Sequence, residues 1–276
     1  MGFYIVQFLT GLSDASSLFL IASGLSLIFG VTRIVNFAHG SFYMVGAYVA
    51  YSFISFLPQN FYFFWIGVLG AALVVGVLGV FVEISLLRRL YHVPELFLLM
   101  ATFGIVLILQ DGTRWIFGAE DLLGPRAPGI DGSVNIMGSL IPQYDLVLIV
   151  IAPLVLGGIW LMFHRTRWGV LVRAATEDRE MVSFLGVNQA RLYTGVFFLG
   201  SFLAGLGGAI QLPKGGADLL MDMNVIAAAF VIVVVGGMGS IIGAYVAYSF
   251  ISFLPQNFYF FWIGVLGAAL VVGVLG

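Results

Sequence analysis

The sequence predicts an all-α integral membrane protein that crosses a bilayer about eight or nine times. Apolar residues make up 61% of the 276 residues and charged residues only 9%, whereas a soluble domain has roughly 45–50% and about 25%. The mean hydropathy is +1.11, and the 36 glycines are typical of membrane helices that pack closely against one another. These values exclude an ordinary water-soluble globular protein.

The predicted spans are apolar runs of about 17–25 residues, because a helix needs about that length to cross the hydrocarbon core. In chain order they lie at residues 9–31, 40–57, 61–87, 95–117, 144–163, 192–212, 224–236, 240–254 and 258–276. The seventh run is short and leads into a glycine-rich stretch. It is therefore either a full span or a half-helix that ends inside the protein.

Arginine positions predict the orientation, because short loops rich in Lys and Arg stay in the cytoplasm. Arg88 and Arg89 mark one inner loop, and the arginine-rich segment 164–191 marks another. The segment 118–143 carries three acidic residues, Glu120, Asp121 and Asp131, against Arg126 alone, and is predicted to face outward. By alternation Arg33 is expected inside, and the loop 213–223, which carries the chain's single lysine, Lys214, is expected outside.

An internal repeat divides the chain. Residues 46–79 and 243–276 have the same sequence at every position. Duplicated halves of transporters keep their fold but lose sequence identity, so an identical copy indicates either a very recent duplication or an error in joining DNA reads. The predicted division is a permease-like domain at 1–242 and an anomalous segment at 243–276.

The longest charged segment contains a predicted short helix at residues 177–185. Thr176 is expected to cap it, and Glu177 and Asp178 to lie in its first turn, where the helix dipole favours carboxylates. Gly186 is expected to end the helix in a left-handed conformation.

Val182 and Leu185 are spaced to share an apolar face of that helix, with Met181 beside them. Such a helix lies flat on the membrane surface and offers a docking site for a partner. The alternative is a solvated loop helix that contacts nothing.

Two other motifs place polar or flexible residues at the ends of spans. Asn36 and His39 are three residues apart and share a face on a continuing helix, and Gly40 permits a break. These residues either line the inner mouth of a pathway or satisfy free backbone groups at a helix end. A glycine-rich stretch either hinges a gate or allows close packing; it contains Gly236, Gly237 and Gly239.

Missing motifs argue against an enzyme and against a resident cofactor or metal. There is no G-x-x-x-x-G-K-[ST] sequence, no cysteine, and no H-E-x-x-H among the three histidines, so a partner must hydrolyse any ATP. The net charge of −2 gives no basic surface for nucleic acid. The carboxylates within spans that suggest ion coupling are limited to Asp14, Glu83 and Asp111, which weakens that mechanism.

Four stretches of the chain resemble the membrane permease of branched-chain amino acid ABC importers. They are GLSLIFGVTRIVNFAHGSFYMVGAYVAY at 24–51, LLMATFGIVLILQDGTRWIFGAEDLLGPRAPG at 98–129, GVLVRAATEDREMVSFLGVNQARLYTGVFFLGSFLAGLGGAIQLP at 169–213 and AFVIVVVGGMGSIIGA at 229–244. The resemblance covers roughly residues 1–244 and implies the ABC importer permease fold.

The resemblance also implies a setting and a function. The chain is expected in a bacterial inner membrane beside a second, similar permease, two cytoplasmic P-loop ATPases that bind ATP and Mg²⁺, and a periplasmic substrate-binding protein. Leucine, isoleucine and valine are the family's usual cargo, and relatives carry urea, short amides and other amino acids. The resemblance implies alternating access as the mechanism.

The resemblance assigns roles to the motifs described above. The cytoplasmic segment that contacts an ATPase is expected to contain Arg173, Ala174, Ala175, Glu177, Asp178 and Gly186. The Asn36–Gly40 and Gly236–Ser240 motifs are expected to flank the translocation pathway.

The resemblance stops at the second copy of the repeat, where the family continues with other helices and a different tail. The chain as written is therefore expected to assemble poorly or transport weakly. Two alternatives remain open: an ATP-independent channel or ion-coupled carrier for a small polar solute, and a nonfunctional chimeric permease.

Overall fold

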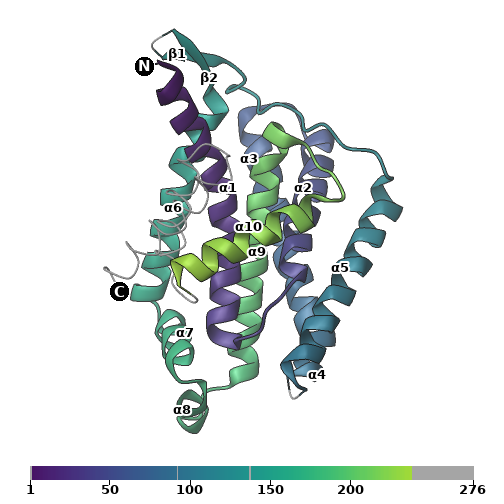
Figure 1. The fold of residues 1–276 in the computed structure, drawn as a ribbon, viewed down its shortest axis with the longest axis vertical. Coiled ribbons are helices and arrows are strands. Elements are labelled where there is room, and N and C mark those ends of the chain that lie inside the picture. Colours follow the sequence, from purple (N-terminus) through teal and green to yellow (C-terminus); the bar gives the residue numbers. More distant parts are fainter. Residues whose placement is uncertain (1, 92, 137, 238–276) are drawn as a thin grey trace.

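The computed structural model describes residues 2–91, 93–136 and 138–237 and contains a bundle of helices with one small hairpin (Figure 1). The elements are α1 (Gly2–Thr32), α2 (Ala38–Phe56), α3 (Phe61–Val82), the π-helical turn η1 (Glu83–Leu87), α4 (Arg88–Leu90), α5 (Glu95–Phe117), β1 (Ser133–Ile136), β2 (Ser139–Pro142), α6 (Gln143–Arg165), α7 (Arg167–Glu177), α8 (Arg179–Phe184), α9 (Gln189–Gly215) and α10 (Met221–Gly236). The predicted all-α membrane fold is confirmed.

Each of the first seven predicted spans forms a helix. In the described residues, those long and apolar enough to cross a membrane are Ile5–Thr32, Phe61–Leu90, Leu96–Phe117, Gln143–Arg165 and Gln189–Gly215. The remaining two of the seven predicted spans form α2, with 19 residues, and the shorter α10, with 16 residues. The predicted runs at 240–254 and 258–276 lie outside the described residues, and so does the second copy of the repeat. The division of the chain at residue 242 therefore stays a prediction.

Helix α9 is the centre of the bundle and packs most extensively against α3, α1 and α2. The contacts are close because glycines remove side chains where backbones meet. A Cβ atom on Gly208 would collide with the carbonyl oxygen of Tyr43 in α2, and one on Gly46 in α2 would collide with the backbone of Gly205 in α9. Helix α10 runs obliquely across the bundle instead of parallel to α9 (Figure 1).

The first copy of the repeat belongs to this core. Residues 46–79 form most of α2 and α3. Gly46, at the start of the copy, meets Gly205 of α9, and Gly79, at its end, lies so close to Ser201 of α9 that a Cβ atom would not fit. The first copy is thus shaped to fit α9.

The predicted inner and outer loops separate to opposite ends of the bundle (Figure 1). The end near α4, α7 and α8, which we name the α8 end, carries Arg33, Arg88, Arg89, Arg165, Arg167, Arg173, Arg179 and Arg191. The end near β1 and β2, which we name the hairpin end, carries Arg114, Arg126 and Lys214. Lys214 lies in the last turn of α9, so its predicted place in a loop is wrong; α9 continues past the apolar run.

Candidate functional site

The predicted coupling segment folds as two helices, α7 and α8, instead of one. Helix α8 begins at Arg179, because the Asp178 carboxylate accepts two of its free backbone N–H groups, each at 3.0 Å. The predicted cap, Thr176, is wrong: its hydroxyl donates to the carbonyl of Val172 at 3.0 Å within α7. Gly186 has a φ of +82°, which confirms its predicted left-handed conformation after the helix.

Helix α7 is fixed to the end of α6. The guanidinium Nη1 of Arg173 donates to the carbonyl oxygen of Phe163 at 2.7 Å, and Ala175 is buried. Ala174 and Glu177 are exposed. Among the residues of the predicted coupling segment, Arg173 and Ala175 therefore attach it to the bundle, whereas Ala174 and Glu177 remain available to a partner.

Helix α8 lies at the extreme α8 end of the bundle (Figure 1) and carries exposed apolar residues. The predicted face of Val182 and Leu185 is wrong, because Val182 is buried and Leu185 is exposed. The exposed surface consists of Met181, Phe184 and Leu185, with 83% of Phe184 accessible to solvent; we name it the α8 tip. Sequence reasoning missed Phe184, although the i, i+3, i+4 spacing of these three residues was the signal.

A short connection joins α8 to the central helix. The side-chain amide of Gln189, the first residue of α9, donates to the carbonyl of Arg179 at 2.6 Å. Asn188 caps α9 by accepting the N–H of Arg191 at 3.1 Å. The Gln189 hydrogen bond therefore attaches the start of α8 to the start of α9.

The polar residues predicted to line a pathway are fully buried. Asn36 lies before α2 and its Oδ1 accepts the N–H of Ala38 at 3.1 Å, so Asn36 and His39 do not share one continuous helix as predicted. The Nε2 of His39 donates to the carbonyl of Ile21 at 3.0 Å. Within the described chain, Asn36 Nδ2 and His39 Nδ1 have no hydrogen-bond partner. Their predicted role in transport stays a prediction.

Close packing explains the glycine at the start of α2. Gly40 continues the helix and does not break it; a Cβ atom there would lie 2.5 Å from the carbonyl oxygen of Asp222, so the glycine lets α10 approach. Gly236 is the last residue of α10, and Gly237 follows with a φ of +87°. Gly239, the third residue of the predicted hinge, lies outside the described residues.

A buried carboxylate ties α10 to two other helices. Asp222, with 1% of its surface exposed, accepts hydrogen bonds from the hydroxyl of Ser41 in α2 at 3.0 Å and from the amide of Gln110 in α5 at 2.9 and 3.0 Å. No ion pair to Asp222 occurs within the described ranges. Sequence reasoning missed this residue because it placed it in an outer loop.

Replacing Asp222 with alanine is expected to lower the free energy of unfolding by about 2 kcal/mol, because Ser41 and Gln110 lose their buried acceptor. Thermal unfolding of the purified protein in detergent checks this result. The control is Asp111→Ala, which removes an exposed carboxylate from α5 and is expected to leave the midpoint unchanged. Equal midpoints for both variants would show that the Asp222 cluster does not hold α10.

A second polar cluster joins α3 to α9 near the α8 end. Glu83 is fully buried; it pairs with Arg88 at 2.8 Å and accepts the hydroxyl of Thr194 at 3.0 Å and that of Tyr91 at 3.3 Å. Burial, assisted by the negative charge of Glu83, raises the pKa of Tyr91 well above its ordinary value. The Tyr91 phenol therefore stays protonated and donates a hydrogen bond to the Glu83 carboxylate.

A third cluster joins α1, α6 and α9 near the hairpin end. The ammonium of Lys214 lies 2.6 Å from Asp14 and 3.3 Å from the buried Asp145. Asp14 and Glu83, two of the carboxylates that the sequence offered for ion coupling, are thus both paired with basic residues.

Comparison with known proteins gives a consistent family. Residues 7–276 match the family described as branched-chain amino acid transport system / permease component. The match includes the second copy of the repeat. No solved structure matches the chain.

Curated relatives agree with this match. The high-affinity branched-chain amino acid transport system permease protein BraD of Pseudomonas aeruginosa is 29% identical over 254 residues, which cover 87% of this chain and 81% of the relative. LivH of Escherichia coli K12, with the same description, is 26% identical over 88% of this chain and 82% of its own length. The fructose import permease protein FrcC of Rhizobium meliloti is 25% identical over 61% of this chain and 49% of its own length.

Proposed function

The chain belongs to the family of branched-chain amino acid transport permease components, and we propose that it is the membrane-spanning subunit of an ATP-driven importer in a bacterial inner membrane. The family match over residues 7–276 carries the proposal. The cargo is leucine, isoleucine, valine or a related amino acid or amide. The bundle of apolar helices supports this function, because each long helix is able to span a bilayer.

The distribution of charge supports an orientation. Basic residues gather at the α8 end, and such residues stay in the cytoplasm when they lie in short loops. The α8 end is therefore assigned to the cytoplasm and the hairpin end to the periplasm. A cytoplasmic ATPase then meets α7 and α8, and a periplasmic binding protein delivers substrate to the hairpin end.

The α8 tip is the proposed contact with an ATPase. Its three apolar side chains are exposed on a helix at the extreme end of the bundle (Figure 1), and such side chains bury well in a groove of a partner. Movement of the tip passes to α9 through the Gln189 hydrogen bond and to α6 through Arg173. Alternating access follows if nucleotide binding by the partners shifts these two helices.

The assembly has a defined composition. This chain pairs with a second homologous permease, two cytoplasmic P-loop ATPases and a periplasmic substrate-binding protein. ATP and Mg²⁺ are bound by the ATPases, because the sequence of this chain has no P-loop. The chain is a transport subunit and not an enzyme.

Replacing Phe184 with serine is expected to weaken association with the ATPase about tenfold or more, because an exposed aromatic anchor is lost from the contact. The measurement is the amount of ATPase that copurifies with the tagged permease from membranes. The matched control is Leu140→Ser, which removes an exposed apolar residue at the opposite, hairpin end. Unchanged copurification for Phe184→Ser, or an equal loss for Leu140→Ser, would contradict the assignment of the α8 tip.

One observation favours a second function, that of an ion-coupled carrier for a small polar solute. Asp222 is a buried carboxylate with no ion pair among residues 2–91, 93–136 and 138–237, and such groups bind protons or sodium in ion-coupled carriers. The hydrogen bonds from Ser41 and Gln110 account for Asp222 as a structural group. The two functions differ in the energy source for uptake, which is ATP for the importer and a proton or sodium gradient for the carrier.

A further inference from the structure

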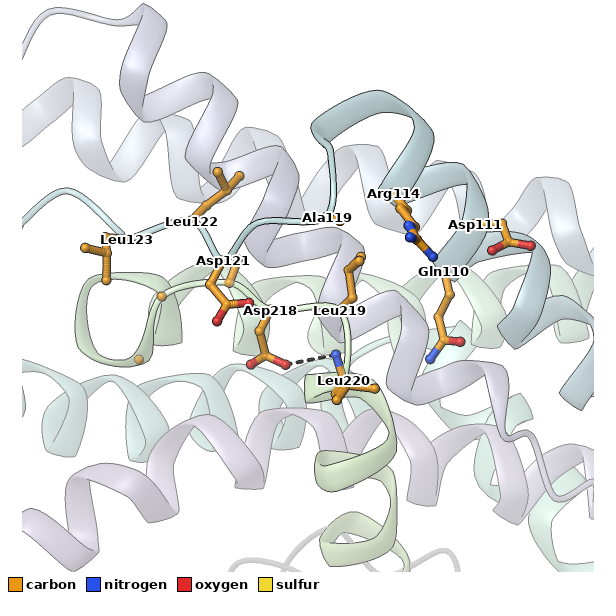
Figure 2. Close-up of a pocket in the computed structure, with 13 residues that line it drawn as sticks. Gln110, Asp111, Arg114, Ala119, Asp121, Leu122, Leu123, Asp218, Leu219 and Leu220 are labelled. Atoms are coloured by element: carbon orange, nitrogen blue, oxygen red, sulfur yellow. Dashed lines mark hydrogen bonds between the residues drawn. The ribbon is translucent and has the colours of Figure 1, made fainter.

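A cavity of about 600 Å³ opens at the hairpin end, between the end of α5 and the connection from α9 to α10 (Figure 2). The segments that surround it are the last two turns of α5, residues 119–123 and residues 215–220. Its volume lies within the range of small-molecule sites.

The cavity has a fixed wall. Leu122 and Ala217 exchange two backbone hydrogen bonds, of 2.9 and 2.8 Å, which join the segment after α5 to the segment before α10. Gly216 has a φ of +73°, and a Cβ atom there would lie 2.8 Å from the carbonyl oxygen of Leu122. The two segments therefore hold one another in place on this side of the cavity.

Opposite charges line the cavity from different segments. Arg114 and Gln110 come from α5 on one side, whereas Asp121 and Asp218 lie together on the other (Figure 2). One oxygen of Asp218 accepts the N–H of Leu220 at 2.8 Å, and its second oxygen is left for another donor. In the described part of the chain, none of the three charged residues forms an ion pair. Asp111, the fourth charged group, lies on the far side of Arg114 (Figure 2).

Apolar side chains complete the lining. Leu122 and Leu219 are half-buried and line the cavity, and Leu219 lies between Asp218 and the α5 side (Figure 2). A guanidinium binds a carboxylate well and a pair of carboxylates binds an ammonium, while the leucines suit an aliphatic side chain. A zwitterionic α-amino acid with an aliphatic side chain carries these three features.

We propose that this cavity is a transit site for such an amino acid on the periplasmic side of the permease, with the substrate carboxylate on Arg114 and its ammonium between Asp121 and Asp218. The proposal rests on the proposed function, which supplies the class of cargo, and it adds a binding site within the permease itself.

The site is connected to helix α10. Gln110 lines the cavity, and its amide donates to both carboxylate oxygens of Asp222, the buried group that ties α10 to Ser41 of α2. A ligand that contacts Gln110 therefore acts on the same cluster that positions α10.

The experiment measures binding of tritiated L-leucine to the full-length chain in the complex with which it purifies, in nanodiscs and without the binding protein. Saturable binding is expected, and unlabelled leucine is expected to displace the tracer about tenfold better than leucinamide, which lacks the carboxylate, or N-acetyl-leucine, which lacks the ammonium. Because these analogues are tested on the unaltered protein, the result does not depend on whether a variant folds.

Substitutions of the charged residues then test which of them binds each charged group of leucine. Arg114→Gln and Asp218→Asn are each expected to weaken leucine binding about tenfold or more. Arg114→Gln is also expected to remove the preference for leucine over leucinamide, which general damage to the fold would not do. The matched control is Arg126→Gln, which alters an arginine of a different cavity at the same end and is expected to leave the affinity unchanged.

Three outcomes would overturn the proposal. They are no saturable binding to the unaltered complex, wild-type affinity in Arg114→Gln, and loss of leucine binding when phosphatidylethanolamine is added to the nanodiscs, which would assign the cavity to a lipid headgroup. ATP-driven leucine uptake is measured on the same preparation with the binding protein added. Uptake without a binding site in the cavity contradicts only this proposal, whereas absence of uptake contradicts the proposed function.

Discussion

Replacing Gly208 with leucine is expected to prevent the protein from accumulating as a folded species in the membrane. A Cβ atom at this position collides with the carbonyl oxygen of Tyr43, and the amide nitrogen of Ala47 lies 3.1 Å away. The obstructing atoms are backbone atoms of α2, so helices α2 and α9 must separate. The cost is about 3 kcal/mol or more, and the better helix propensity of leucine, worth about 1 kcal/mol, does not offset it.

The yield of monodisperse protein in size-exclusion chromatography, together with its thermal unfolding midpoint, checks this expectation. The matched control is Gly157→Leu in α6, where a Cβ atom meets nothing within 4 Å in the described part of the protein. This variant is expected to behave like the unaltered protein. A folded Gly208→Leu variant with an unchanged midpoint would show that α2 and α9 do not pack as described.

Replacing Arg88 with methionine is expected to cost about 3 kcal/mol of folding free energy, because it removes the basic partner of a buried carboxylate. Glu83 is 0% exposed and pairs with Arg88 at 2.8 Å. Its hydrogen bonds from Thr194 and Tyr91 remain, but they do not neutralise its charge. The thermal unfolding midpoint of the purified protein measures the loss.

Two further variants distinguish the loss of the Glu83–Arg88 ion pair from a general effect of removing a positive charge. Arg89→Met removes the neighbouring arginine, which is exposed, and is expected to change the midpoint little. The double variant Glu83→Gln with Arg88→Met is expected to recover much of the stability, because no unpaired charge stays buried. A midpoint for the double variant below that of Arg88→Met alone would contradict the ion-pair explanation.

Hydropathy was sufficient to predict most of the fold. The apolar runs at 9–31, 61–87 and 192–212 correspond to α1, to α3 with η1, and to α9. Each run is long enough to span a bilayer, and the cost of burying free backbone groups leaves a helix as its only structure there. The separation of arginines between loops likewise predicted which loops share an end of the bundle.

Hydropathy was not sufficient to predict the polar contacts between helices. Asp222 lies just before the apolar run 224–236 and Asp145 is the second residue of the run 144–163. From the sequence, neither is distinguishable from an exposed residue at the end of a helix. Their burial depends on Ser41, Gln110 and Lys214, which lie far away in the chain. Only the packing of helices brings these residues together.

Two possible capping residues explain why the start of the helix in the coupling segment was predicted wrongly. Thr176 and Asp178 are both good helix caps, and the sequence alone does not decide between them. In the structure, α7 extends through Glu177, which leaves Asp178 to start α8. Helix α8 also ends at Phe184, with Leu185 as its C-cap, so Val182 is buried while Phe184 and Leu185 are exposed.

Substrate uptake tests most directly whether this chain forms the membrane path of an ATP-driven importer. The complete complex is reconstituted in proteoliposomes with ATP inside, and uptake of labelled leucine is measured with the binding protein outside. Uptake is expected to require both ATP and the binding protein and to persist when a protonophore dissipates the proton gradient. Leucine uptake without ATP, driven by a proton or sodium gradient, would contradict the claim and favour an ion-coupled carrier.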